Sequence, residues 1–136
     1  MLNQTVHYRA GSGWNAPLPA ALDSDQTLVL AFAAADFTDD DPVFADLVRA
    51  FPKALHLGCS TAGEIAGPAV HDASVVVAIV RFDHTRLQRA ATSVESPADS
   101  FAAGARHARQ LAGPGLRAVF LLSDGLGVNG TPLVGG

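Results

Sequence analysis

The sequence TLVLAFAA at Thr27–Ala34 is an uninterrupted apolar run of strand length. Such a run is typical of a strand buried on both faces, as in parallel or mixed sheets that helices cover. The residues that follow predict a helix, because Asp39–Asp41 provide an N-cap, Pro42 suits the first turn, and apolar residues recur at helical spacing up to Pro52. A buried strand followed by an amphipathic helix indicates an α/β domain.

Further strands and a second helix continue this pattern along the chain. The expected elements are strands at Leu55–Gly58, Ser74–Phe82, Arg86–Val94 and Arg117–Leu122, and a helix from Ser96 to about Leu111. The short turn Asp83–Thr85 is expected to join two of the strands as a hairpin. The sequence therefore predicts the order β-α-β-β-β-α-β, an α/β fold with helices packed on a mixed β-sheet.

The two ends of the chain differ from this regular part. Residues 1–26 are rich in Gly, Pro and Ala and predict an irregular N-terminal arm, with one short helical turn near Pro19–Leu22. Near the other end, Thr131 and Pro132 are typical of a helix start, but only four residues follow Pro132. We therefore expect that this helix does not form, and that the α/β domain, residues 27–136, is truncated at its C-terminus.

The composition favours a folded protein and excludes several functional classes. The chain has 136 residues, of which 49% are hydrophobic and 16% charged, so one domain with a packed core is expected. Nine basic and thirteen acidic residues give a net charge of -4, and the basic residues are scattered, which excludes a nucleic-acid groove. The chain lacks a signal peptide and a membrane-spanning apolar run, so we expect a cytoplasmic location without membrane insertion.

Two glycine-rich segments each follow a predicted strand. Gly58–Glu64 has the glycine spacing of a phosphate-binding P-loop, but Glu64 stands where a P-loop has lysine, and its charge would repel a phosphate. Gly125–Gly130 matches the glycine spacing of dinucleotide-binding loops, but Thr131 and Pro132 delay the helix that should begin within it. Neither segment alone predicts nucleotide binding.

Considered together, these segments suggest a ligand site. Ligands of open α/β sheets bind beyond the carboxyl ends of the strands, so the segments would face each other if their strands were parallel neighbours. The candidate ligand-binding residues are Gly58, Cys59, Ser60, Thr61, Gly63, Glu64, Ser123, Asp124, Gly125, Asn129 and Gly130. This set includes no lysine or arginine, so it suits a small ligand that is polar and neutral or carries an amine. The alternative is that its polar members only cap helices and close turns.

The cysteine and histidines leave two further alternatives open. Cys59 follows a strand and could act as a nucleophile, although a single cysteine is more often a small core residue. The five histidines lack metal-ligand spacing, so no metal site is expected. His56 and His71 flank the first glycine-rich segment and, with Cys59, are the candidate ligands of a haem iron, although ordinary hydrogen-bonded histidines are more common. No cofactor other than haem is suggested.

Three segments carry a resemblance to a known family. GCSTAGEI (Gly58–Ile65) and LLSDGLGVNGTPLV (Leu121–Val134), with the strand SVVVAIVRF (Ser74–Phe82) between them, resemble the N-terminal domain of the FIST family of bacterial sensory proteins. The resemblance runs from about Thr27 to the end of the chain. It implies an intracellular signal-input domain rather than an enzyme, normally followed by a C-terminal FIST domain.

The resemblance also implies ligands and partners. Members of the family have been proposed to bind small molecules such as amino acids, and some resemble haem-dependent nitric oxide sensors. The loops Gly58–Glu64 and Asp124–Gly130 would make the ligand contacts. The expected signalling partners are histidine kinases, diguanylate cyclases or phosphodiesterases that act on cyclic-di-GMP, and chemoreceptors.

Overall fold

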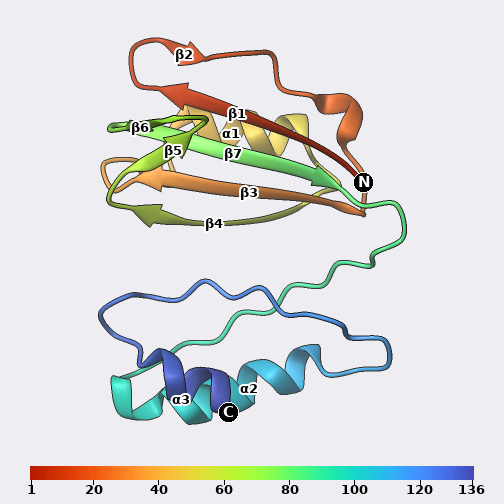
Figure 1. Cartoon of the computed structure of the whole chain (residues 1–136), viewed down its shortest axis with the longest axis vertical. Coiled ribbons are helices and arrows are strands. Elements are labelled where there is room, and N and C mark those ends of the chain that lie inside the picture. The colour runs from red at the N-terminus through yellow and green to blue at the C-terminus, as the bar shows by residue number, and fades with distance from the viewer. The chain divides into compact units, whose positions relative to one another are not determined.

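A five-stranded mixed sheet forms the centre of the first of two structural units. The computed structural model describes residues 1–136, and the chain divides into Met1–Leu87 (unit 1) and Gln88–Gly136 (unit 2). The sheet has the order β2-β1-β7-β3-β4, and its strands are β1 (Leu2–Arg9), β2 (Gly13–Trp14), β3 (Thr27–Ala34), β4 (Leu55–Thr61) and β7 (Ser74–Arg81). Strands β3 and β4 are parallel and the other pairs are antiparallel, which confirms the predicted α/β fold with a mixed sheet (Figure 1).

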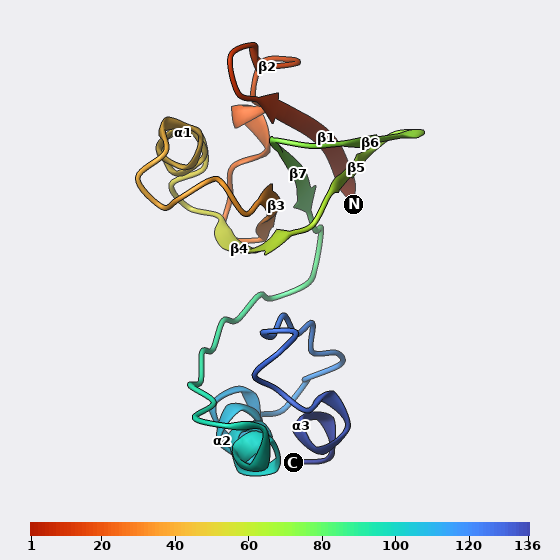
Figure 2. The same ribbon diagram turned by 90° about the vertical axis from the view of Figure 1, so that its left-hand side faces the viewer.

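The two faces of this sheet carry different elements. Helix α1 (Pro42–Ala50) lies on one side, and the hairpin of β5 (Glu64–Ala66) and β6 (Ala69–His71) lies on the other (Figure 2). Side chains of a strand alternate between faces, and those turned toward α1 form the core. The buried apolar residues of this core are Val6, Val29, Ala33, Val43, Leu47, Phe51, Val75, Val77 and Ile79. The apolar run at β3 and the helix after it thus form as the sequence predicts.

The prediction of an irregular N-terminal arm over residues 1–26 is wrong. Strand β1 pairs with β7 along its whole length, from Leu2 opposite Arg81 to Arg9 opposite Ser74. The composition conceals this strand, because Val6 is its only fully buried residue and its polar residues lie at the surface. The predicted helical turn near Pro19–Leu22 is confirmed as a 3₁₀ turn at Ala20–Leu22.

The glycine-rich segment after Leu55 is also more regular than predicted. Strand β4 continues to Thr61, and the residues that follow form the antiparallel hairpin β5–β6. Gly67 lies in the tight turn of this hairpin with a φ of +62°, a conformation that glycine adopts without steric strain. Much of the expected long loop between Gly58 and Asp72 is therefore strand.

Unit 2 contains helices, but neither of the strands predicted at residues 86–94 and 117–122 forms. Helix α2 (Ser100–Leu111) follows a 3₁₀ turn and confirms the helix predicted from Ser96. Residues 86–94 and 117–122 are not strands, and the hairpin at Asp83–Thr85 does not form, so the predicted chain order β-α-β-β-β-α-β is wrong. Helix α3 (Gly130–Gly135) does form, contrary to expectation, because Leu133 buries its side chain.

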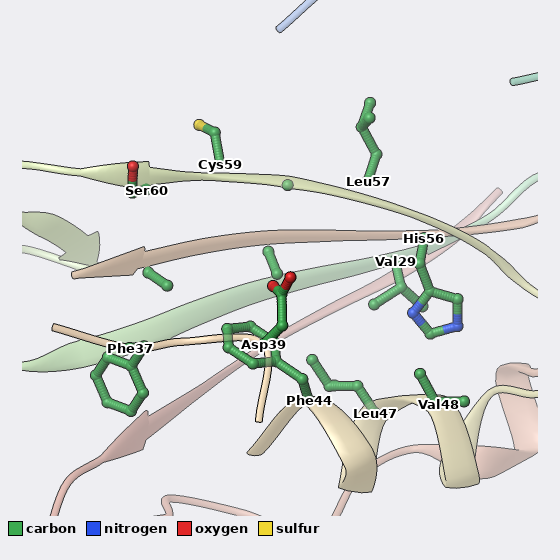
Figure 3. Close-up of a pocket in the computed structure, with 13 residues that line it drawn as sticks. Val29, Phe37, Asp39, Phe44, Leu47, Val48, His56, Leu57, Cys59 and Ser60 are labelled. Atoms are coloured by element: carbon green, nitrogen blue, oxygen red, sulfur yellow. The ribbon is translucent and has the colours of Figure 1, made fainter. Parts of the chain in front are cut away.

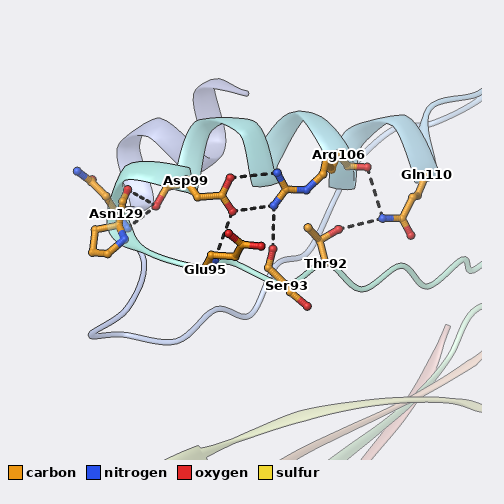
Figure 4. Close-up of polar contacts among 9 residues, drawn as sticks. Thr92, Ser93, Glu95, Asp99, Arg106, Gln110 and Asn129 are labelled. Carbon is orange, nitrogen blue, oxygen red and sulfur yellow. Dashed lines mark hydrogen bonds and ion pairs between the residues drawn. The ribbon is translucent and has the colours of Figure 1, made fainter.

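Side chains of α2 form hydrogen bonds with the segment that precedes the helix in the sequence (Figure 4). Arg106 donates to both carboxylate oxygens of Asp99, at 3.0 and 2.7 Å, and to the carbonyl oxygen of Ser93 at 2.9 Å. Gln110 donates to the hydroxyl of Thr92 at 2.9 Å and to the carbonyl oxygen of Ala91 at 3.2 Å. The hydrogen bond from Arg106 holds the pKa of the Asp99 carboxyl below its ordinary value. Residues 91–93 thus bond to helix side chains instead of a neighbouring strand.

The contact between α2 and α3 depends on a glycine. A Cβ atom at Gly104 would overlap the backbone carbonyl of Leu133, which cannot move without moving α3. We expect Gly104→Ala to destabilise unit 2 by about 2 kcal/mol, because the helices must separate. The measurement is amide hydrogen exchange, in which α3 should lose protection. The control is Gly113→Ala, since a Cβ there meets nothing within 4 Å. Equal protection of α3 in both variants would contradict this packing.

Candidate ligand-binding cleft

A cleft of about 510 Å³ lies between α1 and the sheet of unit 1 (Figure 3). Its volume falls within the range of about 300–1,000 Å³ that is usual for small-molecule sites. It is lined by Val29, Ala31, Ala33, Phe37, Asp39, Phe44, Leu47, Val48, His56, Leu57, Gly58, Cys59 and Ser60. These residues come from β3, β4, α1 and the segment that joins β3 to α1. The sequence-predicted residues Gly58, Cys59 and Ser60 therefore belong to the cleft.

Small residues on the two parallel strands leave the space for this cleft. Ala31 lies opposite Gly58 in the pairing of β3 with β4, and Ala33 lies opposite Ser60. A Cβ at Gly58 would overlap the backbone of Ala31, so the close approach of the strands requires glycine there. Between His56 and Ser60, β4 therefore presents no side chain to α1, and the cleft stays open.

Three polar side chains are available to a molecule in the cleft. Asp39 points from the connecting segment toward the sheet, as Figure 3 shows, and it is exposed. Nε2 of His56 donates to the carbonyl oxygen of Phe51 at 2.9 Å, which fixes the ring and leaves Nδ1 as the remaining polar atom. Ser60 adds a hydroxyl. No lysine or arginine lines the cleft, so the Asp39 carboxylate is its permanent charge. An ammonium group complements this arrangement, and the rings of Phe37 and Phe44 can also attract it.

Glu64 lies outside the cleft and is 1% exposed. Its two carboxyl oxygens accept hydrogen bonds from the hydroxyls of Thr61 and Ser74, both at 2.7 Å. These bonds join β4, β5 and β7 and account for the burial of a polar group. Thr61 takes part in the same cluster, and Gly63 is near Val70. In this structure Glu64 is therefore buried within the fold, and each of its oxygens already accepts a hydrogen bond from the protein.

The second predicted segment, Ser123–Gly130, belongs to unit 2, whereas the first belongs to unit 1. Within unit 2, the Asp124 carboxylate accepts from the amide of Leu126 at 2.8 Å, and the amide of Asn129 donates to the hydroxyl of Ser100 at 2.9 Å. These contacts match the turn-closing role that the sequence left open. The meeting of the two segments around one ligand stays a prediction.

The three haem candidates do not converge. His56 points toward α1, whereas Cys59 points away from it, as Figure 3 shows. His71, on β6, accepts a hydrogen bond from Arg9 at Nδ1 and stacks on His7. No group of three or more His, Cys, Asp or Glu side chains is arranged to hold a metal ion.

Residues of the α1 wall were not among the predicted site residues. The sequence pattern places Asp39 at the start of the helix, and Phe44 and Leu47 on its core-facing stripe. Asp41 is the residue at the N-cap, which leaves Asp39 free. The signal in the sequence was the position of Asp39 shortly after the carboxyl end of β3, where α/β proteins place ligands.

Unit 1 is thus an α/β unit with a cleft beside two parallel strands. Residues 27–136 match the family model described as the FIST N domain, and the chain belongs to this family. Its members are sensory domains of signal transduction. No curated protein and no solved structure matches the chain. None of its helices combines the length and apolar character needed to cross a membrane.

Proposed function

We propose that this protein is a cytoplasmic sensory domain that binds a small amine-bearing molecule, such as an amino acid, in the cleft between α1 and the sheet. The observation that carries the proposal is the pairing of a single permanent charge, the Asp39 carboxylate, with apolar and aromatic walls. A ligand with an ammonium group and an apolar body would satisfy both. The domain would act by binding, without catalysing a reaction.

The segment that carries Asp39 supports a signalling role for this cleft. It joins β3 directly to α1, and Val43 and Leu47 of α1 are buried against the sheet. A ligand held by both Asp39 and the sheet would therefore bias the position of the helix. We propose that the receiver is a histidine kinase, a chemoreceptor, or a cyclase or phosphodiesterase of cyclic-di-GMP, through the C-terminal FIST domain that normally follows.

The amine proposal has more structural support than its two alternatives. A haem sensor would need His56, His71 or Cys59 near one iron, and these side chains point in different directions or are hydrogen-bonded elsewhere. A Cys59-dependent enzyme would need a base next to the thiol, and His56 lies on the opposite face of β4.

The first test is a thermal-shift screen with the amino acids and the amines derived from them by loss of the carboxyl group. A ligand at about 100 times its Kd should add about 2.7 kcal/mol to the stability of the folded state. The hit is then titrated by calorimetry against two variants. Asp39→Asn should weaken binding on the order of tenfold or more, because it removes the ion pair with the amine.

The neighbouring Asp40→Asn is the matched control, because Asp40 is exposed and does not line the cleft. It removes the same charge from the protein, so it corrects for long-range electrostatics. Equal affinities of the two variants would reject Asp39 as the amine partner.

A further inference from the structure

Three nitrogen-bearing side chains gather on the face of the unit 1 sheet opposite α1. His7 and Arg9 are two residues apart on β1, so their side chains share one face of the sheet. Val6 and Tyr8 alternate with them and pack in the core on the other face, the one that α1 covers. His71 reaches them from β6. The rings of His7 and His71 stack with centroids 5.4 Å apart and an interplanar angle of 16°. Arg9 donates from Nη2 to Nδ1 of His71.

No carboxylate forms an ion pair with this cluster. The ion pairs of the protein join Asp83 to the N-terminus, Asp46 to Arg49 and Asp99 to Arg106, and none includes Arg9. Glu64 lies opposite His71 in the β5–β6 pairing, but its carboxylate is hydrogen-bonded to Thr61 and Ser74 and forms no ion pair with His71 or Arg9. Asp72, the residue after His71, is exposed and forms no ion pair.

The cluster also has unused hydrogen-bond donors. Arg9 has five N–H donors, and its contact with His71 uses one of them. Because Nδ1 of His71 accepts that bond, the proton of the neutral ring is on Nε2, which has no partner in the protein. The ring of His7 makes no hydrogen bond either. On β7, the residues that pair with His7 and Arg9 are Val76 and Ser74, which do not titrate.

The backbone next to His71 is held in an unusual conformation. Ala73 has a φ of +49°, and it is the only residue other than glycine with a positive φ. Its carbonyl oxygen accepts a hydrogen bond from the amide of Ala10 at 3.4 Å, which ties this corner to the end of β1. Conformations of this kind persist where the surrounding structure fixes them, and they are common near ligand sites. This bond links the residue after Arg9 to a residue two positions after His71.

We propose that Arg9, His7 and His71 form a binding site for a small oxyanion, such as a sulfate, phosphate or carboxylate group. The guanidinium fork matches an oxyanion, and the imidazole N–H groups supply further donors. The ring of His7 makes no hydrogen bond in the protein and can gain a proton when an anion binds, so affinity should increase as the pH falls. His71 stays neutral in this arrangement, because its Nδ1 accepts from Arg9. This site is on the other face of the sheet from the cleft, and it does not depend on the proposed amine ligand.

The experiment is a titration of the 136-residue chain with sodium sulfate, in which the NMR signals of the imidazole rings are recorded at each sulfate concentration. Sodium chloride keeps the ionic strength constant. Sulfate keeps its charge between about pH 6 and pH 8, so a change in affinity over this range reports on the histidines. His84 and His107 serve as internal controls, because neither belongs to the cluster.

We expect saturable shifts of His7 and His71, tighter binding at the lower pH, and a loss of affinity on the order of tenfold in Arg9→Gln and in His71→Gln. The matched control Arg49→Gln should bind like the original chain. Trp14 fluorescence checks that each variant is folded. Signals of His7 and His71 that move no more than that of His84 would overturn the proposal, and so would unchanged affinity in Arg9→Gln.

Discussion

Replacement of Glu64 by alanine is expected to lower the free energy of unfolding of unit 1 by about 3 kcal/mol. The change removes a buried side chain and leaves the hydroxyls of Thr61 and Ser74 without their acceptor, and Ser74 is 0% exposed. Glu64→Gln should cost less, about 1–2 kcal/mol, because the amide keeps the volume and one acceptor oxygen.

Trp14 provides the measurement for both Glu64 variants. It is the only tryptophan, it lies in unit 1, and its Nε1 donates to Asp46 at 3.2 Å, so its fluorescence reports the unfolding of this unit in denaturant. Glu95→Gln is the control, because it changes the only other glutamate and lies in unit 2. Glu64→Gln with original stability but weaker amine binding would favour the sequence-based assignment of Glu64 to the ligand.

Gly58→Ala is expected to cost unit 1 about 2–3 kcal/mol and to reduce ligand binding as well. The added methyl group would overlap the backbone of Ala31, so β3 and β4 must move apart where Ala31 and Gly58 line the cleft. Both effects thus come from one displacement. They are measured by denaturation with Trp14 fluorescence and by calorimetry with the amine found in the screen.

Gly63→Ala is the matched control for this glycine. Its Cβ would lie 3.4 Å from the nearest atom, a Cγ1 of Val70, which is an ordinary contact. We expect this variant to keep both stability and affinity. If Gly58→Ala behaved in the same way as Gly63→Ala, the close approach of the parallel strands would not be needed to form the cleft.

The correctly predicted elements carry their signal locally. Strand β3 is continuously apolar, and α1 combines helix-start residues with helical periodicity, so neighbouring residues are sufficient to predict both. Strand β1 lacks such a signal, because its extended form depends on pairing with β7, which is distant in sequence. The reverse holds for residues 117–122, which have strand composition but pair with no strand in the structure, and Val119 and Phe120 remain exposed.

The candidate site was predictable only in part for similar reasons. Gly58, Cys59 and Ser60 follow an apolar strand, the position at which α/β sheets bind ligands, and all three line the cleft. Whether they contact a ligand stays a prediction. The contribution of Asp39 depends on how the segment before α1 folds back over the sheet, which no local pattern encodes. The sequence predicts that Glu64 contacts a ligand, because a charged residue in a glycine-rich segment is usually exposed. In the structure two hydroxyl groups donate to its carboxylate, which allows the side chain to be buried.

The most direct test of the amine-binding cleft is a map of the bound ligand by NMR. The isotope-labelled chain is titrated with the amine from the thermal-shift screen, and contacts between ligand and protein protons are recorded. The account predicts contacts to Phe44, Val48 and Ser60, with amide shifts concentrated in β3, β4 and α1. Contacts confined to Gly125–Gly130, or to the hairpin β5–β6, would contradict it.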